Sequence, residues 1–419
     1  MKRPFGLFKL AVSVYAGCLS VSIPAHAEEA HNLAKIYSTL NELKTKVESQ
    51  EARIEALEDE NKMLRTQSAA EPAPQVHTAK RSSTLSAFNP EIGLVADITG
   101  ISTESDEDAE GNDKLSVREV EIVFGHDIDP YSRFDSTFTL SDFEDPEIEE
   151  AYITHFGLPA NIKMRLGRLR PKIGKASASH RDQLDTVDEP FVVQQFLGVE
   201  GLFKTSAEFS SFLPLGSESF VQELTAGVME GGAGEGGNIF GETKRRPSLY
   251  AHLKNFWEIS DSSDFELGGT YLHGSSDEDS KYEVNGYGLD TTLVHYFNAT
   301  NKLKLQGEIY LQDRDEAALV EEDGAVPFDD NLYGFYALAD YRLSPRFGIG
   351  GRFDRVEPVN LDQGTDDTLA YTGYLTFYQS EFARWRAQYQ FVDLPNGEDD
   401  NRFFLQSTIA IGVHKHQLQ

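Results

Sequence analysis

The stretch KLKLQGEIYL, residues 302–311, decides the fold class of this chain. Its odd-numbered positions carry Leu, Leu, Gly, Ile and Leu, and its even-numbered positions carry Lys, Lys, Gln, Glu and Tyr. Apolar and polar residues that alternate with a period of two predict a β-strand with one apolar and one wet face. The stretches RWRAQYQF, residues 384–391, and RFDSTFTL, residues 133–140, repeat this alternation.

Sixteen segments of this kind are predicted between Phe88 and the C-terminus. They cover residues 90–99, 115–126, 132–141, 147–156, 161–170, 201–213, 218–229, 247–257, 263–273, 283–297, 301–312, 331–343, 346–355, 367–379, 382–391 and 401–413. Gaps after even-numbered segments are short, and gaps after odd-numbered segments are long, except for 142–146. Tight turns on one side and longer loops on the other are typical of transmembrane β-barrels. We therefore predict an all-β transmembrane barrel of about 16 antiparallel strands, preceded by an N-terminal α-helical coiled coil.

The composition excludes two other classes of protein. Of the 419 residues 39% are apolar and the mean hydropathy is −0.42, and after residue 25 no segment approaches the ~18 apolar residues of a spanning helix. A formal net charge of −31 argues against nucleic acid as a partner. Cys18 is the only cysteine, so the chain forms no intramolecular disulfide and no cysteine-based metal cluster.

Residues 1–27 have the form of a secretory signal peptide. Basic residues near the start precede an apolar stretch over residues 10–23, and Ala25-His26-Ala27 matches a small-x-small cleavage site. The alternative is lipidation at Cys18, because residues 15–18, YAGC, resemble a lipoprotein box with Tyr15 in an unusual position.

Residues 28–66 are predicted to form a coiled coil. From residue 31 apolar side chains recur at the a and d positions of nearly five heptads without Pro or Gly, which predicts association of several copies. Residues 67–87 contain Pro72 and Pro74 and no periodicity, which is typical of a linker. The barrel then occupies residues 88–419.

The longest gap, residues 171–200, is the first candidate for function. A sixteen-stranded barrel leaves an aqueous channel, and this loop combines charges of both signs with an apolar block in its second half. That block consists of Phe191, Val192, Val193, Phe196 and Leu197. We expect the loop to fold into the lumen and narrow it; the alternative is packing on the outer mouth or at a subunit contact.

Charged residues on and near this loop are the predicted selectivity residues. The basic set on the strands and the loop is Lys163, Arg165, Arg168, Arg170, Lys172, Lys175, Arg181, Arg352, Arg384 and Arg386. The acidic set on the loop is Asp182, Asp185, Asp188 and Glu189. We expect a bulge at Gly167 to turn the neighbouring arginines inward, and opposing basic and acidic walls to set a transverse field. The alternative for each residue is an ordinary solvated lumen side chain.

The segments around residues 148–201 resemble a known family. IEEAY at 148–152, LGRLRPKIG at 166–174, VDEP at 187–190 and FLGVEG at 196–201 are similar to porin-like outer-membrane proteins of the phosphate-selective porin O/P superfamily. Some members carry the name zinc-regulated TonB-dependent outer membrane receptor. The resemblance implies a sixteen-stranded, trimeric barrel, and a coiled coil before such a barrel is similar to the trimeric dicarboxylate-type porins.

Together these features predict a trimeric porin of a Gram-negative outer membrane, with its coiled coil in the periplasm, that passes small hydrophilic or charged solutes. Outer-membrane lipid and lipopolysaccharide are the expected surroundings. The alternatives are a receptor-type barrel for metal or metal complexes, and a non-conducting envelope tether. No catalytic motif is present, and we expect neither an enzyme nor a cofactor or bound metal.

Overall fold

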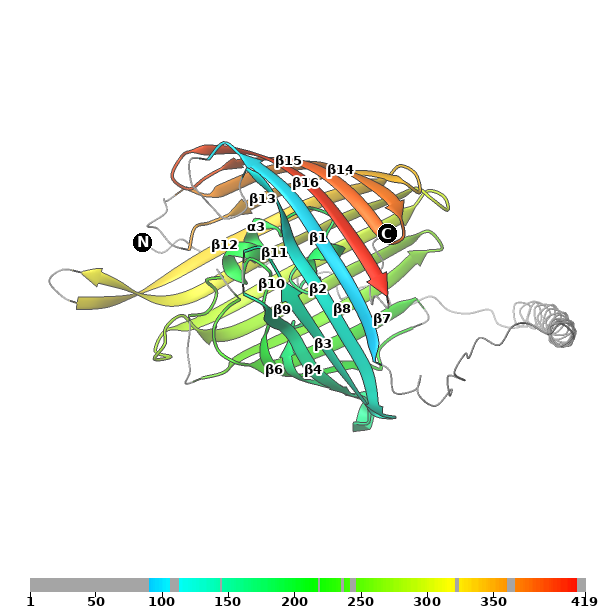
Figure 1. Ribbon diagram of the computed structural model, residues 1–419. Coiled ribbons are helices and arrows are strands. Elements are labelled where there is room, and N and C mark those ends of the chain that lie inside the picture. Colours follow the sequence, from blue (N-terminus) through cyan, green and yellow to red (C-terminus); the bar gives the residue numbers. More distant parts are fainter. Residues whose placement is uncertain are drawn as a thin grey trace, which may run out of the picture. The chain divides into compact units, whose positions relative to one another are not determined.

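The computed structural model describes residues 90–105, 113–143, 145–217, 219–234, 237–241, 246–320, 324–359 and 366–412. The predicted signal peptide, coiled coil and linker lie outside these residues. The described residues form one closed barrel of sixteen antiparallel strands (Figure 1). This confirms the predicted class and strand number of the barrel.

The strand bounds follow the predicted segments closely, with one exception described below. The strands are β1 (Glu91–Thr103), β2 (Lys114–Asp129), β3 (Ser132–Leu140), β4 (Glu147–His155), β5 (Lys163–Leu169), β6 (Lys204–Phe212), β7 (Phe220–Met229), β8 (Ser248–Ser260), β9 (Ser263–Ser275), β10 (Glu283–Tyr296), β11 (Lys302–Val320), β12 (Gly324–Arg342), β13 (Phe347–Val356), β14 (Thr368–Ser380), β15 (Ala383–Asp393) and β16 (Asp399–Gly412). The short helices are η1 (Pro159–Asn161), η2 (Arg181–Gln183) and α3 (Phe191–Phe196).

Each strand pairs with its neighbours in sequence, and β1 closes the sheet against β16. This last pairing runs antiparallel from Gly93↔Gly412 to Thr103↔Arg402. Closure leaves no strand edge with unpaired backbone groups. Among the described residues, no helix is long and apolar enough to cross a membrane.

The two faces of the sheet differ in the way that the alternation predicts. In β15 the inward Arg384, Arg386 and Gln388 are buried, whereas Trp385 and Tyr389 point outward and are about half exposed. Large apolar side chains are exposed on the outer face of most other strands as well, including Leu305 of β11. An apolar exterior around a polar interior is the arrangement of a barrel that faces lipid.

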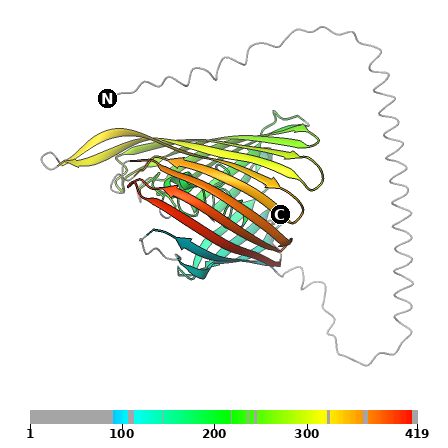
Figure 2. The ribbon, with the colours of Figure 1, turned by 90° about the horizontal axis from the view of Figure 1, so that it is seen from above.

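The prediction that residues 313–330 form a loop between two strands is wrong. The β11–β12 ladder continues to the pair Val320↔Gly324, and this hairpin extends beyond the neighbouring strands (Figure 2). An antiparallel pair continues for as long as its register is unbroken, whether or not a third strand flanks it. The acidic segment is therefore strand, and residues 321–323 connect β11 to β12.

The predicted bulge at Gly167 is also wrong. The pairing of β5 with β4 and β6 runs through Gly167 without a register shift. The shift lies in β4, where Thr137 pairs with Glu150 and Phe138 pairs with Ile148. Gly167 instead has a φ of +138°, and a Cβ atom there would lie 2.2 Å from the carbonyl oxygen of Ala151. Only glycine fits that backbone position without strain.

We expect Gly167→Ala to destabilise the barrel by about 1–3 kcal/mol or more, because it adds backbone strain and a contact with an immobile carbonyl. The measurement is denaturant unfolding of the protein refolded in detergent. Gly373→Ala on β14 is the matched control, since a Cβ there meets nothing within 4 Å. Equal stability of the two variants would contradict the role given to Gly167.

Candidate functional site: the loop inside the barrel

The segment between β5 and β6, residues 170–203, packs against the inner wall of the barrel. Phe191, Val192, Val193 and Phe196 of α3 are buried in one apolar cluster with the loop's Leu197. The wall contributes to this cluster the inward side chains Leu332, Tyr336, Leu338 and Val356. Figure 1 shows α3 within the ring of strands, close to β12. The apolar block of the loop therefore has the partners that its sequence demands.

A wall carboxylate satisfies the first turn of α3. The N–H of Phe191 donates to Oδ1 of Asp354 at 3.0 Å, and the N–H groups of Val193 and Gln194 donate to the carbonyl of Pro190. The first N–H groups of a helix have no partner within the helix. Asp354 on β13 thus fixes where this six-residue helix begins.

Arg352 of β13 joins the same region of the loop to the wall. Its fully buried guanidinium donates to Oδ2 of Asp188 at 2.7 Å, to Oδ2 of Asp354 at 2.7 Å and to Oγ1 of Thr186 at 2.5 Å. Burial raises the pKa of Asp188, but Arg352 and the amides of Gln390 and Gln388 hold this pKa below its ordinary value. Asp188 is therefore a charged and fully partnered carboxylate.

Two further strands, β15 and β11, also bind the loop. Arg386 donates to the carbonyls of Thr186 at 2.8 Å and Leu184 at 3.0 Å, and Arg384 donates to the carbonyl of Asp182 at 2.8 Å. Lys304 of β11 pairs with Asp185. Cationic side chains of β11, β13 and β15 thus bind residues 182–188 to the wall at several points.

The basic residues of β5 and of the start of the loop pair with strand carboxylates. Arg165 pairs with Glu208 of β6, and Arg170 pairs with Glu149 of β4, each at 2.7 Å. Lys175 likewise pairs with Glu266 of β9. These three cations therefore each meet a carboxylate partner directly.

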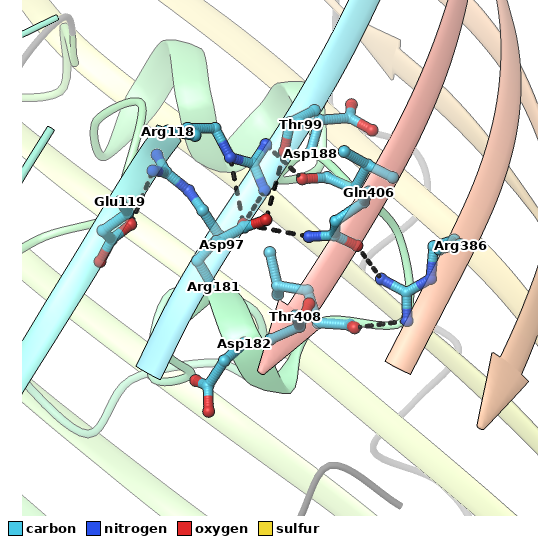
Figure 3. A network of polar contacts seen from close by, with 12 residues as sticks. Asp97, Thr99, Arg118, Glu119, Arg181, Asp182, Asp188, Arg386, Gln406 and Thr408 are labelled. Carbon is cyan, nitrogen blue, oxygen red and sulfur yellow. Dashed lines mark hydrogen bonds and ion pairs between the residues drawn. The ribbon is translucent and has the colours of Figure 1, made fainter. Parts of the chain in front are cut away.

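Arg181 of η2 joins this set beside the β1–β16 seam. It contacts Glu119 at 2.7 Å and Glu200 at 2.6 Å. Figure 3 shows it next to Asp97, on which Arg118, Thr99 and Gln406 converge, while Arg386 reaches Gln406. Asp97 and Arg118 form a buried ion pair that the sequence analysis did not single out.

The four remaining predicted residues are Arg168, Glu189, Lys163 and Lys172. Arg168 is partly exposed and lies over the ring of Phe203 at 5.1 Å, so it does not point inward with Arg165. Burial raises the pKa of Glu189 to about 8, although Arg170 and other cations oppose this shift.

Within the part of the chain that the structure describes, the ammonium groups of Lys163 and Lys172 have no ion-pair partner. Lys172 lines a cavity of about 200 Å³ with Tyr152 and Arg165. Burial, reinforced by Lys163, lowers the pKa of Lys172 to about 8.

The structure adds a cluster that the sequence analysis missed. The β4 bulge adds Glu149 beside Glu150, and both side chains are buried on the lumen side. His180 of the loop lies between them, with Nε2 3.2 Å from Glu150 and Nδ1 3.4 Å from Glu149. Burial lowers the pKa of His180, but Glu149 and Glu121 together hold it well above its ordinary value. Two consecutive acids within a predicted strand were the available signal.

Comparison with known proteins shows the fold. No protein-family model matches the chain. An uncharacterized protein of Aquifex aeolicus (strain VF5) is 27% identical over 340 residues, which cover 74% of this chain and 71% of that protein.

Solved structures with a similar barrel include three outer-membrane proteins. The outer membrane channel DcaP of Acinetobacter baumannii has a TM-score of 0.50 and 13% identity, over 77% of this chain and 96% of that chain. An anion-selective porin from Comamonas acidovorans has a TM-score of 0.52 and 11% identity, over 77% and 100%. OmpF of Salmonella typhi has a TM-score of 0.53 and 9% identity, over 77% and 97%. The fold is thus that of a porin-like barrel, and membership of the phosphate-selective porin O/P superfamily stays a prediction.

We expect Arg352→Gln to release residues 186–189 from the wall, because Asp188 and Asp354 lose their shared cation. Removing one partner of a buried ion pair costs about 3–5 kcal/mol. The measurement is limited proteolysis of the loop together with denaturant unfolding. Arg355→Gln on the same strand is the control, since Arg355 is 41% exposed in its pair with Asp367. Identical behaviour of both variants would contradict the anchoring role.

Proposed function

We propose that this protein is an outer-membrane porin in which small hydrophilic or charged solutes diffuse through a lumen narrowed by loop 171–200. One observation carries the proposal: the loop is attached to opposite parts of the inner wall. Arg170 and His180 bind it to β4, and Arg352 and Arg386 bind it to β13 and β15. A segment with attachments on both sides crosses the lumen, which leaves solutes only the space beside it.

The location and assembly belong to the same proposal. The apolar exterior of the strands supports insertion in a bilayer with lipopolysaccharide in its outer leaflet. The heptads of residues 28–66 support a trimer whose coiled coil lies in the periplasm. The porin-like fold of the solved neighbours supports passive diffusion as the mode of transport.

Single-channel conductance in planar bilayers tests the proposal. We expect the full chain to give ohmic openings in groups of three. If residues 31–66 hold the trimer together, a chain that lacks them should open in single steps. Absence of conductance from correctly folded protein would contradict the porin. A receptor-type barrel or an envelope tether would then account for the same fold.

Selectivity is expected to depend on pH through Lys172. Its pKa of about 8 lies below that of an ordinary lysine, so its charge is present at pH 7 and is lost as the pH rises to 9. Glu208, Glu223, Lys163 and Arg165 surround this ammonium group. The ratio of anion to cation permeability, measured from the reversal potential under a salt gradient, should therefore fall between pH 7 and pH 9.

Lys172→Arg is the matched variant, because a guanidinium keeps its charge throughout this range. We expect it to reduce the pH-dependent fall at least severalfold while it preserves the permeability ratio measured at pH 7. An unchanged pH dependence in this variant would assign the titration to another group.

A further inference from the structure

His180 is surrounded by carboxylates from two strands. Its Nδ1 lies 3.4 Å from Oε1 of Glu149 and 3.7 Å from Oε1 of Glu121, and its Nε2 lies 3.2 Å from Oε2 of Glu150. Glu121 belongs to β2, the two other carboxylates belong to β4, and His180 belongs to the loop. One ligand atom from each of Glu121, Glu149 and His180 falls within 4.8 Å of the others.

One buried acceptor at this place lacks a donor. Glu121 lines the cavity beside His180, and its Oε1 lies 3.7 Å from Nδ1 of His180. Glu149 is 2% exposed, and its Oε2 has no hydrogen-bond partner in the described part of the chain. A buried carboxylate oxygen without a donor carries a large free-energy cost. This unsatisfied oxygen belongs to one of the two carboxylates that lie around Nδ1 of His180.

Three carboxylates lie around His180. The guanidinium of Arg170 pairs with Glu149, the backbone N–H of Arg170 donates to Glu150, and Lys172 lines the same cavity as Glu121. The nearby Arg181 and Arg165 are occupied by Glu119 and Glu208. A proton on His180 supplies one further positive charge to these carboxylates. A divalent cation in place of that proton would supply two.

The donor set and its spacing match one class of ion. One imidazole nitrogen with two carboxylate oxygens suits Zn²⁺ and related first-row metals, whereas Ca²⁺ and Mg²⁺ prefer oxygen ligands alone. Ligands at about 2.0–2.1 Å from a tetrahedral zinc ion lie roughly 3.3 Å from one another. The distances of 3.4 and 3.7 Å from Nδ1 to the two carboxylates are close to that value. The cavity of about 200 Å³ lined by Glu121 and His180 has room for a water as the fourth ligand.

We propose that Glu121, Glu149 and Nδ1 of His180 bind one divalent metal ion of the zinc class, which ties the loop to β2 and β4. Binding releases the Nδ1 proton to solvent, as metal ligation by histidine requires. Glu150 then accepts a hydrogen bond from the opposite ring nitrogen and orients the imidazole. The binding site does not depend on the proposed porin function, and only an effect of the ion on conductance would rest on it.

Cobalt substitution tests the site directly. The full-length protein with His414→Gln and His416→Gln serves as the background, because the sequence His-Lys-His near its end is an independent metal ligand candidate. After chelator treatment in detergent, we expect one Co²⁺ per chain with the intense visible absorption of a four-coordinate site. Zn²⁺ should displace this signal at one equivalent.

Glu121→Gln and His180→Gln should each weaken Co²⁺ binding at least tenfold and remove the four-coordinate absorption. His252→Gln is the control, because His252 is a buried lumen histidine of β8 that hydrogen bonds Thr270. Heat-modifiable migration on gels confirms that each variant is folded, and the conservative Glu121→Gln keeps the test valid if His180→Gln fails to fold. Absence of a four-coordinate signal in the background protein, or its persistence in Glu121→Gln, would overturn the proposal.

Discussion

The continuous backbone ladder from β1 round to β16 is the constraint on which the rest of the structure depends. A spanning structure in lipid must satisfy every backbone N–H and C=O internally, and a closed sheet does so for strands. Closure fixes the side-chain parity of each strand, because one apolar face must turn to lipid. The inner face is then polar by default, and it brings buried arginines and carboxylates together at short range. The loop chemistry follows from that enforced proximity.

Most of the buried charges in the lumen form ion pairs or hydrogen bond to backbone carbonyls. Strands β11, β13 and β15 carry inward cationic side chains. Carboxylates and backbone carbonyls of the loop bind these cations. Arg352 illustrates the exchange, because it bonds both to Asp354 of its own strand and to Asp188 of the loop. The loop is thus held by the same low-dielectric electrostatics that would otherwise destabilise the wall. Its apolar helix α3 adds a hydrophobic attachment beside the ionic ones.

The alternation of residues predicts the barrel well, because a period of two is a local property that closure reinforces in each strand. The stretch 302–311 has the inward and outward faces that its pattern indicates. The extension of the β11–β12 hairpin was not predictable in this way, because the polarity of an acidic stretch taken alone predicts a loop. The register shift at Glu149 could not be predicted from the sequence of β4 alone, because a bulge depends on how the strand pairs with its partner.

The predicted site residues show where local reasoning ends. Sequence parity placed the basic and acidic residues near the lumen, and most of them do contact the loop or its surroundings. Their pairing is a three-dimensional property, and it cancels much of the field that an opposition of walls would create. A charge with a partner at 2.7 Å, such as that of Arg170 or Arg352, contributes a short-range dipole. The residual field therefore comes from the charges that the fold leaves without a partner. A count of basic and acidic residues therefore overstates the number of charges that lack a direct partner in this barrel.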